Sequence, residues 1–401
     1  MIETSLARPV HILVFESRVE GHHLGYLKAI TEELLLAGYR LTLAVNTSPK
    51  PYTKIRAEMG DILERVSIVP ANDGSNGRTS IERIAWLFGQ AQADFVFLPN
   101  LDEIGSAMMR RAAFGLLPPA ILRGRLGGIY YRPRFLGDLG LSPNLWLKAA
   151  GFTRLLHGAW FSHVLLLDPY SHARLKTREP DKPVFFLPDF FPAEFAADRA
   201  AARRQFELPV NQRVFLFYGA GYRRKGLALT VKAMLAMGDD TPALLLCAGK
   251  HEANRHVVHG LEQLVSRGRA RVIDRYVSNE EEKQLFAASD VVLLPYRRHF
   301  GSSGILVRAI GAGLPVIVSD EELIGRLVRE RGLGILFRSG NARALQQAIE
   351  HVAHASQQDM SRWQTAARTA APNWTRAAFR DALVASFDHA VRRLTAQSGA
   401  G

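Results

Sequence analysis

The sequence predicts an α/β protein made of two Rossmann-like domains, each built on a parallel sheet with helices on both faces. The chain has 401 residues, which is more than one ordinary domain needs. Short apolar or β-branched runs alternate with amphipathic stretches, as in parallel-sheet proteins. The alternation pauses once and then restarts. We therefore expect a first domain over 1–190, a connection over 191–209, a second domain over 210–370, and a helix over 371–397 that is a candidate to return to the first domain.

Apolar runs followed by helices define the first predicted domain. Val10–Phe15 is apolar except for one histidine and precedes the amphipathic stretch Leu24–Ala37, which ends at Gly38. A further helix is predicted over Thr79–Gln92. The other strands are predicted at Arg40–Val45, Val66–Val69, Phe95–Pro99, Ala120–Arg123, Val164–Leu167 and Val184–Leu187.

The same rhythm returns in the second predicted domain. Ser278 precedes a helix and Glu281 follows three residues later, which is a capping-box pattern. Gly313 and Pro315 end the helix predicted over Ile305–Ala312. Strands are predicted at Val214–Tyr218, Ala243–Ala248, Arg271–Val277, Val291–Pro295 and Val316–Ser319, with helices at Leu227–Met237 and Arg255–Arg267 and a mostly helical stretch over Arg343–Arg393.

Charge and composition limit the classes of binding partner and the cellular compartment that we expect. Lysine and arginine number 51 against 38 aspartates and glutamates, a net charge of +13 that suits anionic ligands. Paired zinc-finger cysteines and a basic heptad region are both missing, so no nucleic-acid partner is expected. The single cysteine, Cys247, rules out a disulfide within the chain. With no apolar run of about 20 residues and no secretory signal, a cytoplasmic protein is expected.

The segment over 296–313 carries the clearest binding pattern. A strand runs into a loop that contains Arg298, Ser302, Ser303 and Gly304, and a helix follows. Glycine lets the backbone approach a ligand, serine caps the helix, and the free N–H groups at a helix start attract anions. This order predicts a phosphate site. The alternative is an ordinary capped helix behind a solvated basic loop.

A second basic turn follows the first strand of the second domain. Gly219–Gly226 contains Arg223, Arg224 and Lys225 and also opens a helix. It is not a Walker loop, because the Gly-Lys-Ser/Thr element is missing. We expect it to neutralise a diphosphate together with the loop over 296–304; a plain basic turn is the alternative.

Candidate proton acceptors follow strands of the first domain. Glu20, Gly21 and His22 lie where the first strand meets its helix, and Asp102 lies just past the strand that ends at Pro99. Glu20, His22 or Asp102 is placed to accept a proton from a substrate hydroxyl. Helix capping and solvation are the simpler explanations. No set of His, Asp or Glu residues has a spacing that predicts a metal site.

The segment over 123–161 is basic and aromatic. Arg154, Trp146 and Trp160 are among its residues. Such a segment suits an anionic bilayer or a lipid-linked acceptor, which makes the protein a candidate for peripheral membrane contact. Core-facing helices with basic solvent faces explain it slightly better, since several aromatic side chains must pack somewhere.

With these segments placed, the chain resembles the retaining glycosyltransferases of the GT-B fold, especially family 4 (glycosyl transferases group 1). The similarity is strongest over residues 205–340. It rests on the Gly219–Gly226 turn, on Tyr276-Val277-Ser278, on Ala288–Pro295, on Phe300-Gly301, and on Gly313 with Pro315-Val316-Ile317.

The resemblance implies two Rossmann-like domains that face a cleft, with a nucleotide-sugar held by the second domain and the acceptor by the first. It implies sugar transfer without a metal ion or another cofactor. Lys225 matches the basic pair of the family, whereas Ala220 stands at its arginine position. The two glutamates that flank the family's donor loop fall at Phe300 or Arg298 and at Arg308. We therefore expect the donor contacts Gly21, Arg223, Arg224, Lys225, Tyr276, Val277, Arg298, Ser302, Ser303, Gly304 and Arg308.

The sequence thus predicts a hexosyltransferase-type enzyme of polysaccharide biosynthesis that moves a sugar from a nucleotide-sugar to a glycan or a lipid-linked acceptor. The missing glutamates favour one alternative, a catalytically silent protein that binds a nucleotide-sugar or a partner. A nucleotide-sugar epimerase is another alternative, although it needs acid and base carboxylates around the donor, which this loop lacks.

Overall fold

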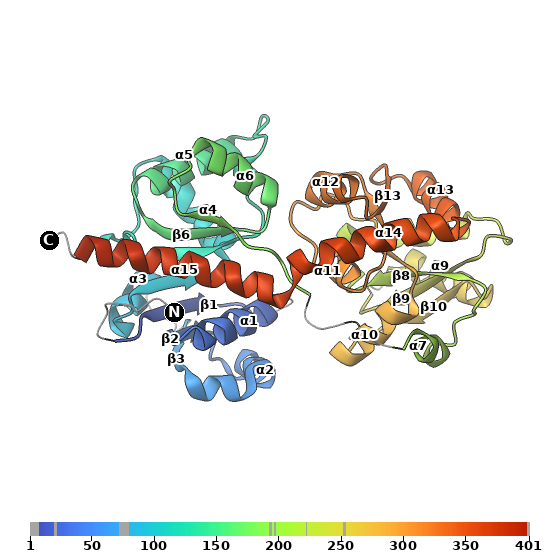
Figure 1. Cartoon of the computed structure of the whole chain (residues 1–401), viewed down its shortest axis with the longest axis horizontal. Coiled ribbons are helices and arrows are strands. Elements are labelled where there is room, and N and C mark those ends of the chain that lie inside the picture. Colours follow the sequence, from blue (N-terminus) through green and yellow to red (C-terminus); the bar gives the residue numbers. More distant parts are fainter. Residues whose placement is uncertain are drawn as a thin grey trace. The chain divides into compact units, whose positions relative to one another are not determined.

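The computed structural model describes residues 8–19, 22–71, 80–191, 195, 198–221, 223–251 and 254–398. The chain divides into two compact units, coloured from blue to red along the sequence in Figure 1. Unit 1 comprises Met1–Leu187 and Phe379–Gly401, and unit 2 comprises Pro188–Ala378. Each unit holds its own parallel sheet and its own apolar core.

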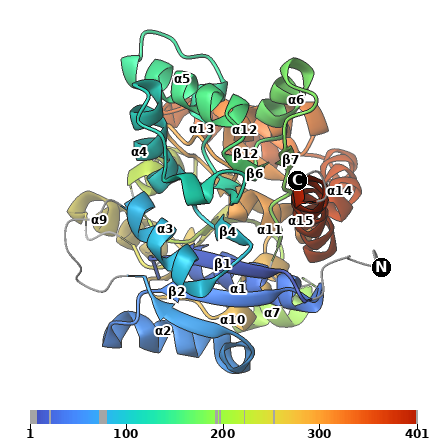
Figure 2. The same ribbon diagram turned by 90° about the vertical axis from the view of Figure 1, so that its left-hand side faces the viewer.

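Unit 1 is built on a seven-stranded sheet in the order β3-β2-β1-β4-β5-β6-β7, with every described pairing parallel. Figure 2 turns this unit toward the viewer, with β1, β2 and β4 close together. All six residues of β1 are buried, as expected for a strand covered on both faces. The strands are β1 (His11–Glu16), β2 (Arg40–Val45), β3 (Ser67–Pro70), β4 (Phe95–Leu98), β5 (Leu126–Tyr130), β6 (Phe161–Leu166) and β7 (Val184–Phe186).

Helices of unit 1 alternate with these strands. They are α1 (His22–Leu36), α2 (Pro49–Met59), α3 (Ser80–Ala91), α4 (Leu101–Ala113), α5 (Pro143–His157), α6 (Pro169–Arg178) and α15 (Arg376–Ser398), with the short helices η1 (Gly60–Arg65), η2 (Ala120–Leu122) and η3 (Arg134–Leu136). From Phe379 onward α15 belongs to unit 1. There the Phe387 ring lies 5.1 Å from that of Phe97, and Tyr39 donates a 3.1 Å hydrogen bond to Asp388.

One strand of unit 1 is not where the sequence predicts it. The expected strand Ala120–Arg123 is wrong, because this segment forms η2, and β5 begins at Leu126. The two glycines of β5 make it resemble a loop. Both are needed for close packing: a Cβ on Gly127 would lie 2.5 Å from the His163 ring, and one on Gly128 would lie 2.7 Å from the Leu98 carbonyl oxygen.

Unit 2 repeats the arrangement with a six-stranded sheet in the order β10-β9-β8-β11-β12-β13, again parallel. Its strands are β8 (Arg213–Tyr218), β9 (Ala243–Ala248), β10 (Ala270–Ile273), β11 (Val291–Leu294), β12 (Val316–Ser319) and β13 (Gly334–Phe337). The predicted fold class, two Rossmann-like α/β domains, is confirmed. The strand predicted over Arg271–Val277 is shorter than expected and ends at Ile273.

Helices of unit 2 begin and end at recognisable caps. Ser278 Oγ accepts a hydrogen bond from the Glu281 N–H, so the predicted capping of that helix is present. Gly313, with φ of 66°, follows the last turn of α11. The helices are α7 (Arg199–Gln205), α8 (Leu227–Leu235), α9 (Arg255–Ser266), α10 (Asn279–Ala288), α11 (Gly304–Gly311), α12 (Glu322–Arg331), α13 (Ala342–Ala353) and α14 (Gln357–Ala370), with the short helices η4 (Arg223–Lys225) and η5 (Ala371–Trp374).

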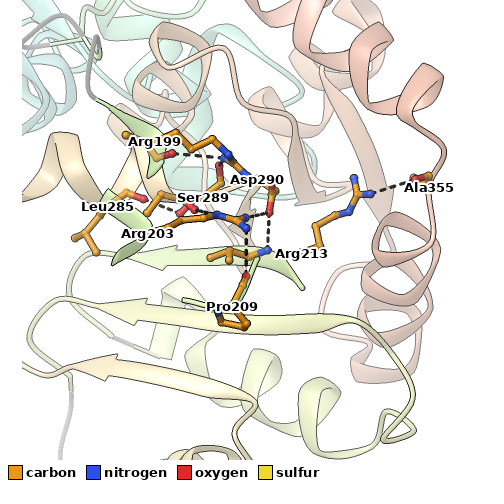
Figure 3. A network of polar contacts seen from close by, with 11 residues as sticks. Arg199, Arg203, Pro209, Arg213, Leu285, Ser289, Asp290 and Ala355 are labelled. Carbon is orange, nitrogen blue, oxygen red and sulfur yellow. Dashed lines mark hydrogen bonds and ion pairs between the residues drawn. The ribbon is translucent and has the colours of Figure 1, made fainter. Parts of the chain in front are cut away.

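A polar network ties α7 to the sheet of unit 2 (Figure 3). The Asp290 carboxylate, just before β11, accepts hydrogen bonds from Arg199 at 2.5 Å, from Arg203 at 2.6 Å and from the Val214 N–H at 2.7 Å. Arg203 also donates to the carbonyl of Pro209. Because α7 immediately precedes β8, these bonds hold the start of unit 2 against its own sheet.

Candidate functional site

The strand order of unit 2 identifies where a ligand belongs. Starting from β8, the chain adds β9 and β10 on one side and β11, β12 and β13 on the other, so the order reverses between β8 and β11. In open parallel sheets, ligands bind beside the carboxyl ends of the strands at such a reversal. The loops that follow β8 and β11 are the two basic segments singled out in the sequence, over 219–226 and 296–304.

These two loops touch each other. The Arg297 N–H donates a 2.9 Å hydrogen bond to the Arg224 carbonyl oxygen, and the Arg224 guanidinium donates to His299 Nδ1. Gly226 adopts φ of 80°, and a Cβ there would collide with the carbonyl of Pro295. The basic turn and the serine loop therefore lie in contact and form one candidate site.

Lys225 lies at the centre of this site. Its Nζ is 5.8 Å from the centroid of the Tyr296 ring and would be 2.8 Å from a Cβ on Gly219, so the glycine leaves room for the ammonium group. Burial, together with the nearby charges of Arg224 and Arg308, lowers the pKa of Lys225 to about 8. Among the described residues it forms no ion pair. A half-buried cation without a carboxylate partner favours an anionic ligand.

The start of α11 adds hydrogen-bond donors. Ser303 is buried and caps the helix, since its Oγ accepts from the Leu306 N–H at 3.3 Å. The N–H groups of Gly304 and Ile305 have no acceptor within the described part of the chain. Such unpaired N–H groups at a helix N-terminus attract negative charge. Ser303 Oγ also lies 3.3 Å from the Tyr296 hydroxyl, and burial raises the pKa of Tyr296 to about 12.

Contacts within unit 2 hold the serine loop in place. Ser302 Oγ donates to Asp189 Oδ2 at 3.2 Å. The His299 Nε2 and the Ser302 carbonyl oxygen are 2.9 Å apart, which makes Nε2 the protonated nitrogen. The Ser302 hydroxyl is thus already engaged with a carboxylate, unlike the N–H groups of Gly304 and Ile305.

Three exposed arginines lie in the same two loops. Arg223, Arg297 and Arg298 form no ion pair with any described residue. Arg298 adopts the left-handed φ of 51°, which is uncommon for a residue with a side chain, and its N–H donates to Glu321 Oε2 at 2.9 Å. Glu321 therefore holds the Arg298 backbone in this conformation and leaves its guanidinium exposed.

Arg308 is in a different situation from the other predicted donor contacts. Its Nε pairs with Glu282 Oε1 at 2.8 Å, and its Nη1 donates to the Gly304 carbonyl oxygen at 3.0 Å. Tyr218 donates to the other Glu282 oxygen at 2.5 Å. Glu282 comes from α10, and no pattern in the sequence singles it out from Glu280 and Glu281. The charge of Arg308 is thus largely compensated inside the protein.

Tyr276 and Val277 do not lie in the two loops of this site. They follow β10, which is two strands from β8. Tyr276 is 84% exposed. Among the described residues neither side chain bonds to the loop after β8 or to the loop after β11. They stay predicted donor contacts and have no geometric support from these loops.

Unit 1 has its own order reversal, between β1 and β4. Of the residues predicted there, Glu20 and Gly21 lie outside the described residues, and His22 is described only as the first residue of α1. The described neighbours form a buried pair that the sequence analysis missed. Glu16, the last residue of β1, accepts from His23 Nδ1 at 3.0 Å and from the Arg18 N–H at 2.9 Å. An acidic residue at the end of an otherwise apolar strand was the available signal.

Asp102 lies at the start of α4. Its two oxygens accept hydrogen bonds from the Tyr131 N–H at 2.7 Å and the Arg132 N–H at 3.0 Å. Burial raises the pKa of Asp102, and these two hydrogen bonds act in the opposite direction. The geometry favours a role in anchoring the loop after β5 over the predicted role as a base. Beside it, Glu103 pairs with Arg18.

The described residues contain no group of three or more His, Cys, Asp or Glu side chains that could hold a metal ion. No helix within the described ranges is long and apolar enough to cross a bilayer.

A protein-family model matches the part of the chain that contains the basic site. Residues 198–370 match the family model "Glycosyl transferases group 1". No curated protein matches the chain at the sequence level. The matched segment contains both loops of the site, so the predicted resemblance and the assignment as a hexosyltransferase-type glycosyltransferase are confirmed.

Solved structures resemble the chain over nearly its whole length. HepE from Anabaena in complex with UDP and glucose is 14% identical, with a TM-score of 0.66, and the match covers 94% of this chain and 99% of that one. WaaG, a glycosyltransferase involved in lipopolysaccharide biosynthesis, is 16% identical with a TM-score of 0.62 over 93% and 98%. A glycosyltransferase from Rickettsia africae is 13% identical with a TM-score of 0.64 over 96% and 97%. These likenesses show the GT-B fold.

Proposed function

Starting from its group 1 glycosyltransferase domain and its GT-B fold, we propose that this protein moves a sugar from a nucleotide-sugar to a hydroxyl of a glycan or lipid-linked acceptor, with retention of configuration and without a metal ion or another cofactor. The main support for the donor is at the order reversal of unit 2: within the described residues, Lys225 has no ion pair and the N–H groups of Gly304 and Ile305 have no acceptor. The HepE structures hold UDP or UDP-glucose, which supports a donor of this class.

The charge distribution suggests how the site assists the reaction. The bond between the sugar C1 and the diphosphate oxygen breaks, and a bond from C1 to the acceptor oxygen forms. Lys225 and the α11 N–H groups stabilise the negative charge that grows on the leaving diphosphate. With retention, a diphosphate oxygen takes the acceptor's proton and no protein base is needed. With inversion, His22, Glu20 or the Glu16–His23 pair is the candidate acceptor of that proton.

Peripheral contact of a cytoplasmic protein with an anionic inner leaflet is part of the same proposal. Lipid-linked acceptors reside at such a surface, and the net charge of +13 favours contact with it. Polysaccharide biosynthesis is the corresponding cellular role.

A thermal-shift panel of nucleoside diphosphates and nucleotide-sugars tests the donor. At least one nucleoside diphosphate is expected to raise the melting temperature, and the matching nucleotide-sugar is expected to do the same. If no compound in the panel shifts the melting temperature, the donor site is refuted.

A silent nucleotide-sugar binder is the second candidate. The resemblance supports it: Arg308, which is paired with Glu282, stands where the family carries one glutamate, and Phe300 or Arg298 stands where it carries the other. Release of nucleoside diphosphate in the presence of an acceptor separates the two candidates: binding with release supports the enzyme, and binding without release over a broad acceptor panel supports the silent protein.

A further inference from the structure

A chain of polar contacts links β8, α10 and α11 of unit 2, next to the basic site; the two helices are labelled in Figure 1. The Tyr218 hydroxyl, at the end of β8, donates to Glu282 Oε2 at 2.5 Å. The other carboxylate oxygen, Oε1, accepts from Arg308 Nε at 2.8 Å. The Glu282 side chain is only 8% exposed. Both oxygens of a buried carboxylate are thus engaged, and these bonds fix the position of Glu282.

The Arg308 guanidinium lies beside the first residue of α11. Its Nη1 donates to the Gly304 carbonyl oxygen at 3.0 Å, and a Cβ on Gly304 would lie 3.0 Å from the same nitrogen. The glycine therefore leaves room for the guanidinium at the helix start, where the N–H groups of Gly304 and Ile305 also lie. Arg308 Nη2 has no acceptor within the described part of the chain. The guanidinium thus keeps N–H donors that a ligand can use.

The charge of Arg308 acts on the centre of the basic site. Burial is the largest cause of the lowered pKa of Lys225, and the charges of Arg224 and Arg308 lower it further. Arg224 lies in the same turn as Lys225, whereas Arg308 comes from α11. Tyr296, which follows β11, also faces Lys225, and burial raises the pKa of its hydroxyl to about 12, so this ring is neutral. Arg308 is therefore close enough to Lys225 for both cations to act on one anion.

We propose that Glu282 is a positioning residue of the basic site: it holds the Arg308 guanidinium at the start of α11, where Arg308 and Lys225 together bind the diphosphate of the donor. The carboxylate compensates the charge of Arg308 but leaves Nη2 available as a donor. This inference rests on the proposed function, because it concerns the site that is assigned to the donor. It adds to that site a residue that lies outside both basic loops.

Titration calorimetry of the full chain with inorganic pyrophosphate at pH 7 tests the proposal, because all the proposed donors share the diphosphate. Glu282→Ala and Arg308→Ala should each weaken binding about tenfold, as expected when a hydrogen bond to a charged group is lost. Glu280→Ala is the matched control, since Glu280 lies on the same helix in an exposed pair with Lys283; it should bind within about twofold of the parent. Equal affinity in Glu282→Ala and Glu280→Ala overturns the proposal.

Two further variants separate the position of Arg308 from the charge of Glu282. Glu282→Gln loses the charge but keeps an oxygen that accepts from Arg308 Nε, so it should bind pyrophosphate no more than about threefold more weakly than the parent. The double variant Glu282→Ala/Arg308→Ala should bind like Arg308→Ala alone. A loss in Glu282→Gln as large as in Glu282→Ala, or additive losses in the double variant, contradicts a role through Arg308. If Glu282→Ala does not fold, Glu282→Leu, which fills the space without an acceptor, takes its place.

The pH profile of binding is a readout that a loss of stability alone would not move. In Arg308→Ala the pKa of Lys225 should rise, because one of the charges that lower it is gone. The fall in affinity with rising pH then moves to higher pH relative to the parent. Glu282→Ala should show the same upward move, since a released Arg308 side chain turns into solvent and its charge is screened. An unchanged or downward move would show that Arg308 stays beside Lys225 without Glu282, and the positioning role would be refuted.

Failure of the proposed function gives a different result from failure of this inference. If pyrophosphate binding depends on Glu282 and Arg308 but no nucleotide-sugar binds, the donor assignment fails and the positioning role holds. If nucleotide-sugars bind equally well to Glu282→Ala and Glu280→Ala, the donor assignment holds and the positioning role fails. A parent chain that binds no pyrophosphate overturns the positioning role outright.

Discussion

In both units the strands at the order reversal, β1 with β4 and β8 with β11, are followed by short loops that lead into helices. The charges in these loops differ. In unit 2 the loops carry Lys225 and the exposed arginines Arg223, Arg297 and Arg298, none of which pairs with a carboxylate among the described residues. In unit 1 carboxylates lie next to these loops, at the end of β1 and the start of α4, and the described ones are already engaged: Glu16 with His23, Glu103 with Arg18, and Asp102 with backbone N–H groups. The same topology thus offers an anion site in one unit and a closed polar network in the other.

This difference assigns separate tasks to the two units. An unpaired cation next to helix N–H groups gains free energy when a diphosphate arrives, because its desolvation has no other compensation. A closed network gains nothing from a charged ligand, but it holds loops in a defined position. We therefore expect changes in unit 2 to alter donor affinity and changes in unit 1 to alter acceptor use or stability.

The largest expected effect comes from the centre of the basic site. Lys225→Ala together with Ser303→Ala should weaken nucleoside diphosphate binding about 100-fold, since a hydrogen bond to a charged group contributes roughly 1.5–3 kcal/mol. Titration calorimetry measures it. Glu16→Gln is the matched comparison in unit 1 and should keep the parental donor affinity within about twofold. If the two variants lose the same affinity, the division of tasks is wrong.

The pH dependence of donor binding should follow Lys225. The lysine binds phosphate as a cation, and its pKa is lowered to about 8, so affinity is full below that pH and falls as the pH rises through it. Between about pH 7 and pH 9 the cationic fraction falls roughly tenfold, and calorimetry should show a loss of similar size. Lys225→Arg, which stays charged, should remove most of this dependence. A flat profile in the parent would show that Lys225 does not contact the donor.

A smaller effect is expected from the buried pair of unit 1. Glu16→Gln removes the charge that faces His23 and leaves the imidazole only a neutral amide oxygen as an acceptor. If this pair positions the acceptor, kcat/KM for the acceptor should fall by about fivefold, or roughly 1 kcal/mol, while nucleotide binding stays unchanged. Steady-state kinetics at saturating donor measure it. Unchanged kinetics would leave the pair a structural feature of α1.

Much of the fold could be predicted because its strands are local, apolar and bounded by turns. Arg40–Val45 and Val316–Ser319 have the predicted bounds. β5 escaped prediction because its glycines are required by neighbours distant in sequence, the His163 ring and the Leu98 carbonyl. In the same way β13, with Gly334 packed against the Val316 backbone, is set by a tertiary contact.

The same distinction between local patterns and tertiary contacts applies to the candidate site. Its basic loops could be predicted, because each pattern lies within one short segment. The partner of Arg308 could not, since the sequence does not show which of three successive glutamates faces α11. The hydrogen bonds of Asp102 could not be predicted either, because their N–H donors lie in the loop after β5, 29 and 30 residues away.

The smallest expected effect concerns Asp102 and distinguishes an anchor from a base. In Asp102→Asn one oxygen is replaced by an amide group that cannot accept from the second N–H, so the free energy of unfolding should fall by about 1–2 kcal/mol. Chemical denaturation measures the change. Glu103→Gln, next to it, breaks only an exposed pair with Arg18 and should cost less than about 0.5 kcal/mol. If Asp102 instead acts as a base, the loop after β5 keeps its position without the carboxylate. The stability of Asp102→Asn should then be close to that of Glu103→Gln, and sugar transfer should be abolished.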